Sequence, residues 1–230
     1  MIETFGIIIF ISIFLYFIWI EIQDKKLLET VTKAHRGTRT ERALVLKLLK
    51  CGVPPQTIFH DLYLENNSGT FSQIDLVVPT KVGIIVFEVK NYKGWIFGTG
   101  YKKYWTQVLA YGKIKHRFYN PVLQNRKHVE DLKKQLKKEN IPFYSVVVFF
   151  GDCVFRHVDS ITDGTFLVKS NQVLEVIKII KNHNEPAFYK DKREIVRILK
   201  DAVKNGDDAE IQTKHIKNIE DILSKNRIYY

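Results

Sequence analysis

Charged side chains interrupt two segments that otherwise resemble buried β-strands. Asp75 lies within residues 73–78, and Glu88 and Lys90 lie within the strongly apolar residues 85–90. Side chains alternate between the two faces of a strand, so Glu88 and Lys90 share one face. If the two strands pair, Asp75 can join them. Two carboxylates and an ammonium group within an apolar sheet are costly unless they neutralise one another or hold a metal ion.

These groups could carry out metal-assisted hydrolysis of a phosphodiester. Two carboxylates suit Mg²⁺ (or Mn²⁺), because hard cations prefer oxygen ligands. Such a cation lowers the pKa of water and neutralises phosphoryl charge, while Lys90 would orient the water or stabilise the developing oxyanion. The alternative is a cross-strand ion pair between a carboxylate and Lys90 on a solvated face. The apolar residues that flank Asp75 and Glu88 favour the functional interpretation.

Hydrophobic periodicity and turn residues predict an α/β domain around these two strands. Thr38 and Glu41 fit a capping box that opens one helix, and Asn120-Pro121 opens another. We expect helices over residues 38–50, 121–139 and 174–180, and strands over residues 58–64, 71–78, 83–90, 95–97, 105–110, 115–119, 144–150 and 165–168.

The first residues have the composition of a membrane anchor. Residues 5–20 carry no charge and are almost all large apolar or aromatic residues. A membrane span needs about 17–25 residues, and a snorkelling Glu21 would extend the usable length. A cleaved signal peptide is the alternative, but the chain lacks a basic start and a small-residue cleavage site. Lysines follow the segment and none precedes it, so we expect a single-pass cell-membrane protein whose C-terminal part is cytoplasmic.

The end of the chain changes to two amphipathic helical patterns, separated by Asn205-Gly206. This predicts a helical hairpin that packs on the domain or on a protein partner. The expected organisation is a transmembrane anchor (residues 1–23), a juxtamembrane linker (24–35), an α/β domain (36–185) and a C-terminal helical hairpin (186–230).

The formal net charge of +11 is concentrated in one part of the chain. Residues 36–150 hold nineteen lysines and arginines against eight acidic residues, and the other segments nearly balance. A basic surface attracts nucleic acid or anionic lipid. Because the anchor would already supply membrane attachment, the charge favours nucleic acid. Two cysteines are too few for a disulfide framework or a four-ligand zinc cluster of the usual spacing.

Cations and aromatic rings are interleaved between residues 101 and 119. The cations could contact phosphates, and the rings could stack on unpaired bases. The alternative is a hairpin with a solvated basic face and an aromatic core face. The candidate nucleic-acid-binding residues are Lys102, Lys103, Lys113, Lys115 and Arg117.

Several separated motifs resemble the NERD (nuclease-related) domain, which is placed in the PD-(D/E)XK nuclease superfamily. The resemblance covers roughly residues 36–135 and rests on Gly37-x-x-x-Glu41, Gln73-Ile74-Asp75, Glu88-Val89-Lys90-Asn91-Tyr92-x-Gly94, Gly98, Trp105 and Asn120-Pro121-x-x-Gln124-Asn125. It implies a nuclease-like mixed β-sheet flanked by helices, with Asp75, Glu88 and Lys90 as the core of the site. Ile74-Asp75 stands where the superfamily usually has Pro-Asp.

Two helical residues match further motif positions. Glu41 could be a third metal ligand or could simply complete the capping box with Thr38. Gln124 could position substrate or water, or be an ordinary polar residue of the first helical turns. His128 lies one turn after Gln124, so it could face the same cleft, but we interpret it as a partly exposed helix histidine.

The sequence therefore predicts a membrane-anchored nuclease-related protein that hydrolyses DNA or RNA with Mg²⁺ or Mn²⁺. The expected metal ligands are Asp75, Glu88 and Glu41, and the expected catalytic residues include Lys90 and Gln124. One alternative is a non-catalytic nucleic-acid-binding module tethered to the membrane. Another is a membrane scaffold for protein interactions.

Overall fold

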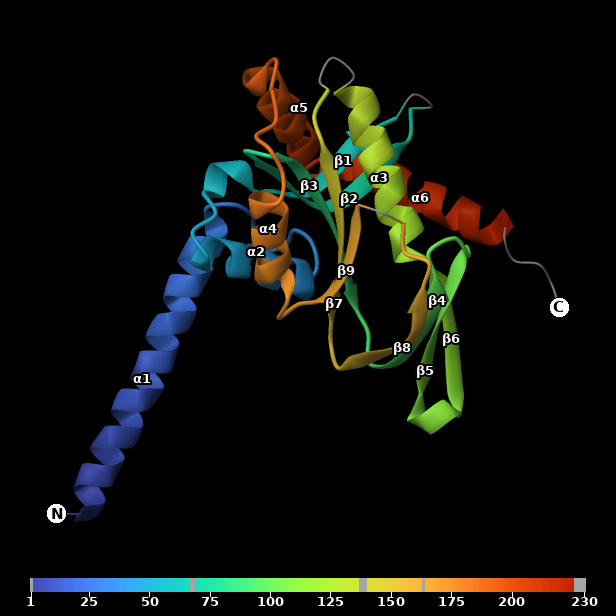
Figure 1. Cartoon of the computed structure of the whole chain (residues 1–230). Coiled ribbons are helices and arrows are strands. Elements are labelled where there is room, and N and C mark those ends of the chain that lie inside the picture. Colours follow the sequence, from blue (N-terminus) through green and yellow to red (C-terminus); the bar gives the residue numbers. More distant parts are fainter. Residues whose placement is uncertain (1, 67–68, 137–139, 163, 226–230) are drawn as a thin grey trace.

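A computed structural model describes residues 2–66, 69–136, 140–162 and 164–225. It shows two β-sheets with helices packed around them, and a long N-terminal helix that extends away from this body (Figure 1). The helices are α1 (Ile2–Glu29), α2 (Arg39–Lys50), α3 (Pro121–Gln135), α4 (Val173–Asn182), α5 (Lys192–Asn205) and α6 (Ala209–Lys225). Two short 3₁₀ helices are η1 (Pro55–Thr57) and η2 (Ala110–Gly112).

The larger sheet has five strands in the order β1-β2-β3-β7-β9. They are β1 (Phe59–Glu65), β2 (Phe71–Thr80), β3 (Gly83–Asn91), β7 (Phe143–Phe150) and β9 (Thr165–Lys169). The first three strands pair antiparallel, and β3 pairs parallel with β7, which pairs parallel with β9. The sheet is therefore mixed, and β3, which carries Glu88 and Lys90, lies at its centre.

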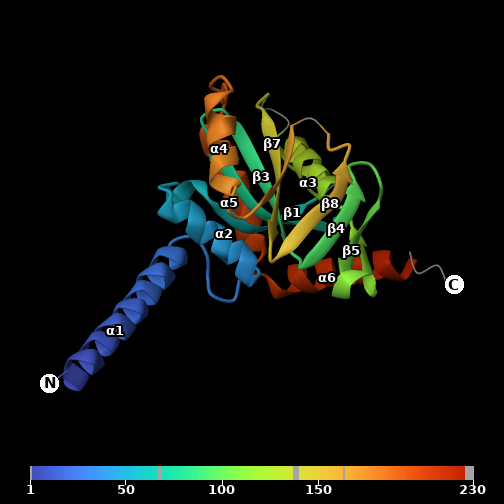
Figure 2. The ribbon, with the colours of Figure 1, turned by 60° about the horizontal axis from the view of Figure 1, so that its bottom comes forward.

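Helices cover both faces of this sheet, because its central strands are apolar on both faces. Helices α2 and α4 cover one face and α3 lies on the other (Figure 2), where α5 also packs. Strand alternation divides β3 between the two layers. Ile85, Phe87 and Val89 pack in the α2–α4 layer, whereas Ile84 and Val86 pack in the layer of α3 and α5. Glu88 and Lys90 continue the second set, toward α3.

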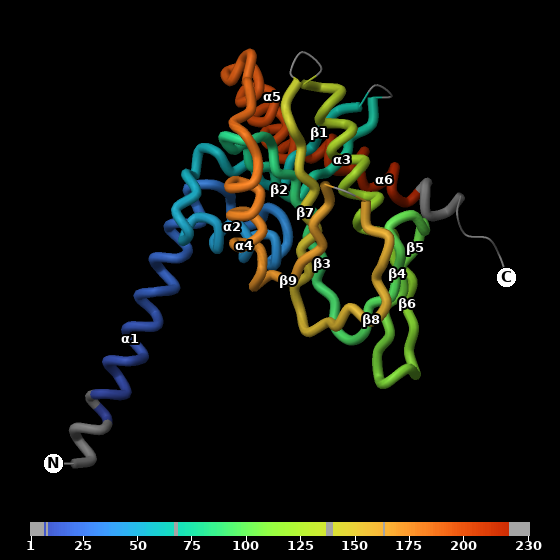
Figure 3. The backbone as a smooth tube through the Cα atoms, viewed as in Figure 1, coloured from blue at the N-terminus to red at the C-terminus, as the bar shows by residue number. Residues whose placement is uncertain are grey.

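The smaller sheet has four strands in the order β6-β5-β4-β8. They are β4 (Gly94–Thr99), β5 (Tyr104–Leu109), β6 (Ile114–Tyr119) and β8 (Cys153–Asp159). The chain leaves the larger sheet after β7, lies parallel to β4 as β8, and returns beside β7 as β9 (Figure 3). One face of the smaller sheet packs on the larger one through Ile96, Trp105 and Phe149.

The mixed α/β fold and the elements expected from the sequence are found, with small changes at their ends. Strand β8 and the separate four-stranded sheet were not predicted. The expected end of α3 at residue 139 lies outside the described residues, since α3 is described to Gln135. The two C-terminal helices are present as α5 and α6, and α5 packs in the same layer as α3.

The predicted transmembrane anchor at residues 1–23 is not supported. Over the part of the chain that the structure describes, none of the helices combines the length and the apolar character needed to cross a membrane.

Candidate functional site

Strands β2 and β3 bring Asp75 beside the residues of the second charged segment. The ladder between them pairs Leu76 with Phe87, next to Asp75 and Glu88. Asp75 Oδ2 accepts a hydrogen bond of 2.7 Å from the backbone N–H of Val89. This bond fixes the Asp75 carboxylate against β3, next to Glu88. The carboxylates of Asp75 and Glu88 therefore lie close together where β2 and β3 pair.

Glu88 and Lys90 form a close ion pair that continues onto helix α3. Lys90 Nζ lies 2.5 Å from Glu88 Oε1 and donates a hydrogen bond of 3.1 Å to Gln124 Oε1. Gln124 is held near the start of α3, where Asn120 caps the helix and Pro121 occupies its first turn. The structure thus brings together the four predicted residues Asp75, Glu88, Lys90 and Gln124.

His128 completes the surroundings of Glu88, one turn beyond Gln124. Its Nε2 lies 3.3 Å from Glu88 Oε2, and its Nδ1 lies 3.1 Å from Ser72 Oγ on β2. His128 is buried, so its interpretation as a partly exposed helix histidine was wrong. The spacing of four from Gln124 was the available signal. Ser72 carried no sequence signal, because its role depends on the pairing of distant elements.

The charges at this site are unequally compensated. Burial, the Glu88 carboxylate and the Glu41 carboxylate together raise the pKa of Asp75 well above its usual range. Burial opposes ionisation of Glu88 as well, but the Lys90 ammonium and His128 lower its pKa overall. Despite burial, Glu88 and Asp75 raise the pKa of Lys90. The Glu88–Lys90 pair is therefore held in its charged form, whereas negative charge on Asp75 is only partly balanced.

Glu41 belongs to a second buried cluster beside the first. Its Oε1 accepts a hydrogen bond of 2.7 Å from Thr38 Oγ1, and its Oε2 lies 3.5 Å from His60 Nε2. The opposite nitrogen of His60 lies 2.8 Å from Thr32 Oγ1. Burial raises the pKa of Glu41, but His60 and Thr38 lower it overall. Glu41 therefore combines capping contacts of α2 with an electrostatic effect on Asp75.

A metal ion at this site would have only a few protein ligands. Among the described residues, no group of three or more His, Cys, Asp or Glu side chains is arranged to hold one. However, Mg²⁺ is often held by one or two carboxylates, with water and substrate phosphates supplying the other ligands. Within the described part of the chain, the buried Oε2 atoms of Glu41 and Glu88 accept no hydrogen bond of good geometry, although each lies near a histidine Nε2, at 3.5 and 3.3 Å respectively. Together with the partly balanced charge of Asp75, these oxygens fit a hard cation held mainly by Asp75 and Glu88.

The predicted nucleic-acid-binding residues lie on the smaller sheet and not among the carboxylates. Lys102 and Lys103 lie in the loop between β4 and β5, and Lys113, Lys115 and Arg117 follow η2 or lie on β6. All five are exposed. The side chain of Asn120 connects this loop to α3, since its Nδ2 donates to the carbonyl oxygens of Thr99 and Lys102 at 3.0 and 2.8 Å.

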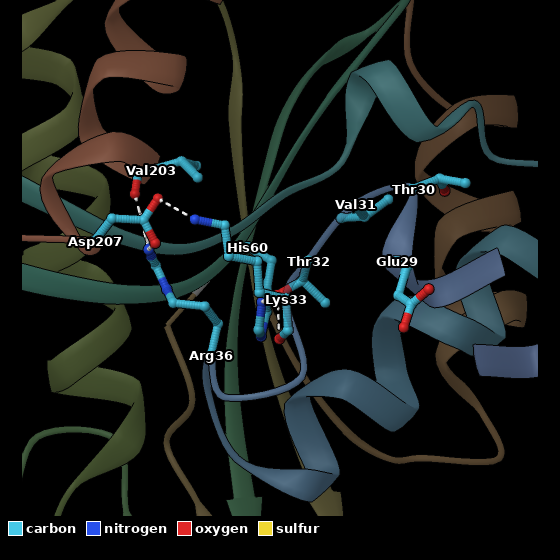
Figure 4. Close-up of a pocket in the computed structure, with 9 residues that line it drawn as sticks. All are labelled: Glu29, Thr30, Val31, Thr32, Lys33, Arg36, His60, Val203 and Asp207. Atoms are coloured by element: carbon cyan, nitrogen blue, oxygen red, sulfur yellow. Dashed lines mark hydrogen bonds and ion pairs between the residues drawn. The ribbon is translucent and has the colours of Figure 1, made fainter. Parts of the chain in front are cut away.

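A separate cavity of about 210 Å³ is lined by His60, Thr32 and Arg36 among other residues (Figure 4). It is bordered by the segment that follows α1 and by the end of α5. Arg36 dominates its polar wall and makes ion pairs with Asp61 and Asp207 at 2.6 and 2.9 Å. These acids, together with the carbonyl oxygens of Asp61 and Val203, engage all three guanidinium nitrogens, so we interpret this region as a structural junction.

Residues 36–150 match the family described as the nuclease-related domain. An uncharacterized protein of Bacillus anthracis is 27% identical over 203 residues, which cover 86% of this chain and 92% of that protein. No solved structure matches the chain.

Proposed function

This chain belongs to the nuclease-related domain family, and from that premise we propose that it hydrolyses phosphodiester bonds of nucleic acid with the help of Mg²⁺ or Mn²⁺. One observation supports the proposal above all. Asp75, Glu88, Lys90 and Gln124 come from three different elements and converge where β2 and β3 meet α3.

Each residue has a distinct part in the proposed reaction. Asp75 and Glu88 would hold the cation, with Glu41 contributing negative charge close by. When bound, the cation would activate water and neutralise phosphoryl charge. Lys90 is charged and lies 3.1 Å from Gln124 Oε1, so it can stabilise the oxyanion that develops on the phosphate. Gln124 positions the Lys90 ammonium and can donate from its own amide to substrate or water.

The basic surface agrees with a polyanionic substrate. The net positive charge of the family-matching residues would attract nucleic acid and make binding depend steeply on salt. Asn120 connects the loop that carries Lys102 to the helix that carries Gln124. The loop that carries these cations is therefore bonded directly to the helix that contributes Gln124 to the proposed catalytic site.

The test is cleavage of labelled DNA and RNA oligonucleotides by the purified full-length chain. We expect product with Mg²⁺ or Mn²⁺ and none with EDTA. Glu88→Gln should reduce the rate about 100-fold or more, because it removes a charged metal ligand. Glu130→Gln, on the exposed side of α3, is the matched control and should leave the rate unchanged. Equal rates for the two variants would reject the proposal.

One observation favours a second function, that of a non-catalytic nucleic-acid-binding module. Both oxygens of Glu88 already face cationic or polar partners, Lys90 at 2.5 Å and His128 at 3.3 Å. A carboxylate occupied in this way can be purely structural. Salt-dependent binding of an oligonucleotide, without cleavage under any divalent cation, would select this function.

A further inference from the structure

The smaller sheet has one face packed against the protein and an opposite face on which Tyr119 is exposed and Trp95, Phe97 and Tyr104 are half-buried. Ile96, Trp105, Phe118 and Phe155 occupy the packed face, where they form a cluster with Phe149 of the larger sheet. Because side chains alternate along a strand, the neighbours of these residues must project from the opposite face. This second face, which we call the outer face, belongs to the sheet at the lower right of Figure 1.

Aromatic rings lie along the outer face on adjacent strands. Tyr104 on β5 and Tyr119 on β6 are paired in register, with their ring centroids 6.3 Å apart. Phe97 on β4 is paired with Thr106 on β5, and its ring lies 5.9 Å from that of His157 on β8. Tyr119 is 43% exposed. The rings thus follow one another across the strands and are not confined to one hairpin.

Cations lie directly against these rings. The guanidinium carbon of Arg117 lies 4.9 Å from the Tyr104 ring centroid, and that of Arg156 lies 4.7 Å from the Trp95 ring centroid. Both arginines are exposed, as is Lys115, which lies with Arg117 on β6, at the opposite edge of the sheet from Arg156 on β8. The exposed carboxylate of Asp159 lies at the end of β8. The balance of charge around the rings is nevertheless positive.

We infer that the outer face is a stacking platform that binds single-stranded nucleic acid. Unpaired bases would stack on Trp95, Phe97, Tyr104 and Tyr119, and phosphates would contact Lys115, Arg117 and Arg156. Rings provide sequence-tolerant stacking, and adjacent cations track the backbone. A duplex stacks its own bases within the helix, so it can use the cations but not the rings. The platform therefore prefers a single strand.

This inference rests on the proposed function, because it specifies the substrate class that reaches the carboxylate site. Lys103 lies over the Tyr104 ring at 5.4 Å, at the edge of the platform. The backbone N–H of Asn120 donates to Lys103 O at 3.0 Å, and Gln124 follows one turn later on α3. A strand crossing Tyr104 would thus leave the platform close to the start of α3. Part of the platform lies outside residues 101–119, the basic and aromatic segment that the sequence indicated. The additional residues are Trp95, Phe97, Arg156 and His157.

The experiment measures binding of a fluorescent 20-nucleotide oligo-dT and of a duplex of equal length to the full-length chain in EDTA. Each base that stacks on a ring contributes about 1–3 kcal/mol, so Tyr119→Ala should weaken oligo-dT binding about tenfold and leave duplex binding nearly unchanged. Tyr119→Phe keeps the ring and should keep the affinity. Phe188→Ala removes an exposed ring elsewhere and is the control.

A second variant tests the same face without changing Tyr119, so the test does not depend on whether Tyr119→Ala folds correctly. Arg117→Gln should weaken binding to both probes and lower the salt dependence by about one ion contact. The inference is overturned if single strand and duplex bind equally, or if Tyr119→Ala behaves like Phe188→Ala. Binding is measured in EDTA, so it does not depend on cleavage. If the protein binds single strands selectively in EDTA but shows no cleavage in the separate assay with Mg²⁺ or Mn²⁺, the proposed function is contradicted and the platform is still supported.

Discussion

Asp75 is the residue on which the charge balance of the site depends. Its carboxylate lies near those of Glu88 and Glu41, while the Lys90 ammonium is paired closely with Glu88. Negative charge on Asp75 therefore costs stability in the absence of a cation. A divalent cation bound there would relieve the repulsion between the Asp75 carboxylate and its neighbours. The proposed metal ligand is therefore a residue whose charge destabilises the metal-free protein.

We predict that Asp75→Asn raises the melting temperature of the protein at neutral pH. The folded-state pKa of Asp75 is raised, so its ionisation lowers stability as pH rises through that pKa. The amide removes this loss and can still accept the hydrogen bond from Val89. Thermal denaturation from acidic to neutral pH would show a growing advantage of the variant. Mg²⁺ should stabilise the wild type and not the variant. A lower melting temperature at neutral pH would contradict this account.

At the scale of elements, the turn before α2 shows how one backbone position makes room for the contact between Glu41 and His60. Gly37 has φ of +62°, a conformation that favours glycine. A Cβ atom there would lie 2.5 Å from the His60 ring and 2.6 Å from Glu41 Oε2. The close approach keeps the Glu41–His60 contact beside Asp75. Glycine is thus needed for both conformation and space.

Gly37→Ala should destabilise the protein by about 2–4 kcal/mol, since strain at positive φ adds to overpacking. Gly52→Ala is the matched control, because Gly52 has φ of +81° and open space around it. Its cost should be only the conformational part, about 1–2 kcal/mol. Urea denaturation gives both values. Equal losses would show that the contacts with His60 and Glu41 do not constrain this turn.

Local signals in the sequence predicted the elements that carry the site. Thr38 caps α2 and Asn120 caps α3, as their residue types and the following Pro121 indicated. Strand alternation predicted that Glu88 and Lys90 share a face, and they form an ion pair. These features depend on residues close together in the chain, so a single sequence can contain the necessary information.

Local sequence signals could not predict the features that form between segments far apart in the chain. Strand β8 was missed because exposed Arg156 and His157 mask its alternation, and its partner β4 lies more than fifty residues earlier. The contacts of His128 with Ser72 and of His60 with Glu41 arise only when helices pack on the sheet. The outer face of the smaller sheet follows from the same long-range pairing. Within the residues that the structure describes, no helix meets the requirements of the transmembrane span that composition predicted.

At the scale of the whole molecule, Arg36 joins the region before α2 to the C-terminal helices. Its guanidinium pairs with Asp61 on β1 and with Asp207 after α5, and it also donates to the carbonyl of Val203 at 3.2 Å. A Cβ at Gly206 would lie 2.1 Å from this guanidinium. The junction therefore connects three segments that are far apart in sequence, and it borders the same cavity as His60.

Arg36→Met should cost about 3–5 kcal/mol of folding stability, because it leaves the buried Asp61 carboxylate without its cation. Arg126→Met removes an exposed ion pair of 3.8 Å with Glu130 and should cost at most about 1 kcal/mol. Adding Asp61→Asn to Arg36→Met should recover part of the loss. If denaturation shows Arg36→Met and Arg126→Met to be equally stable, Arg36 does not hold this junction together.

The most direct test of the proposed function is single-turnover cleavage by Lys90→Met in the full-length chain. Lys134→Met, an exposed lysine of α3, is the control. We predict that Lys90→Met slows cleavage about 100- to 1,000-fold, as expected when a charge aimed at the developing oxyanion is lost. Binding of the same oligonucleotide in EDTA should be unchanged. Equal cleavage rates for Lys90→Met and Lys134→Met would contradict the assignment of the catalytic site to β2, β3 and α3.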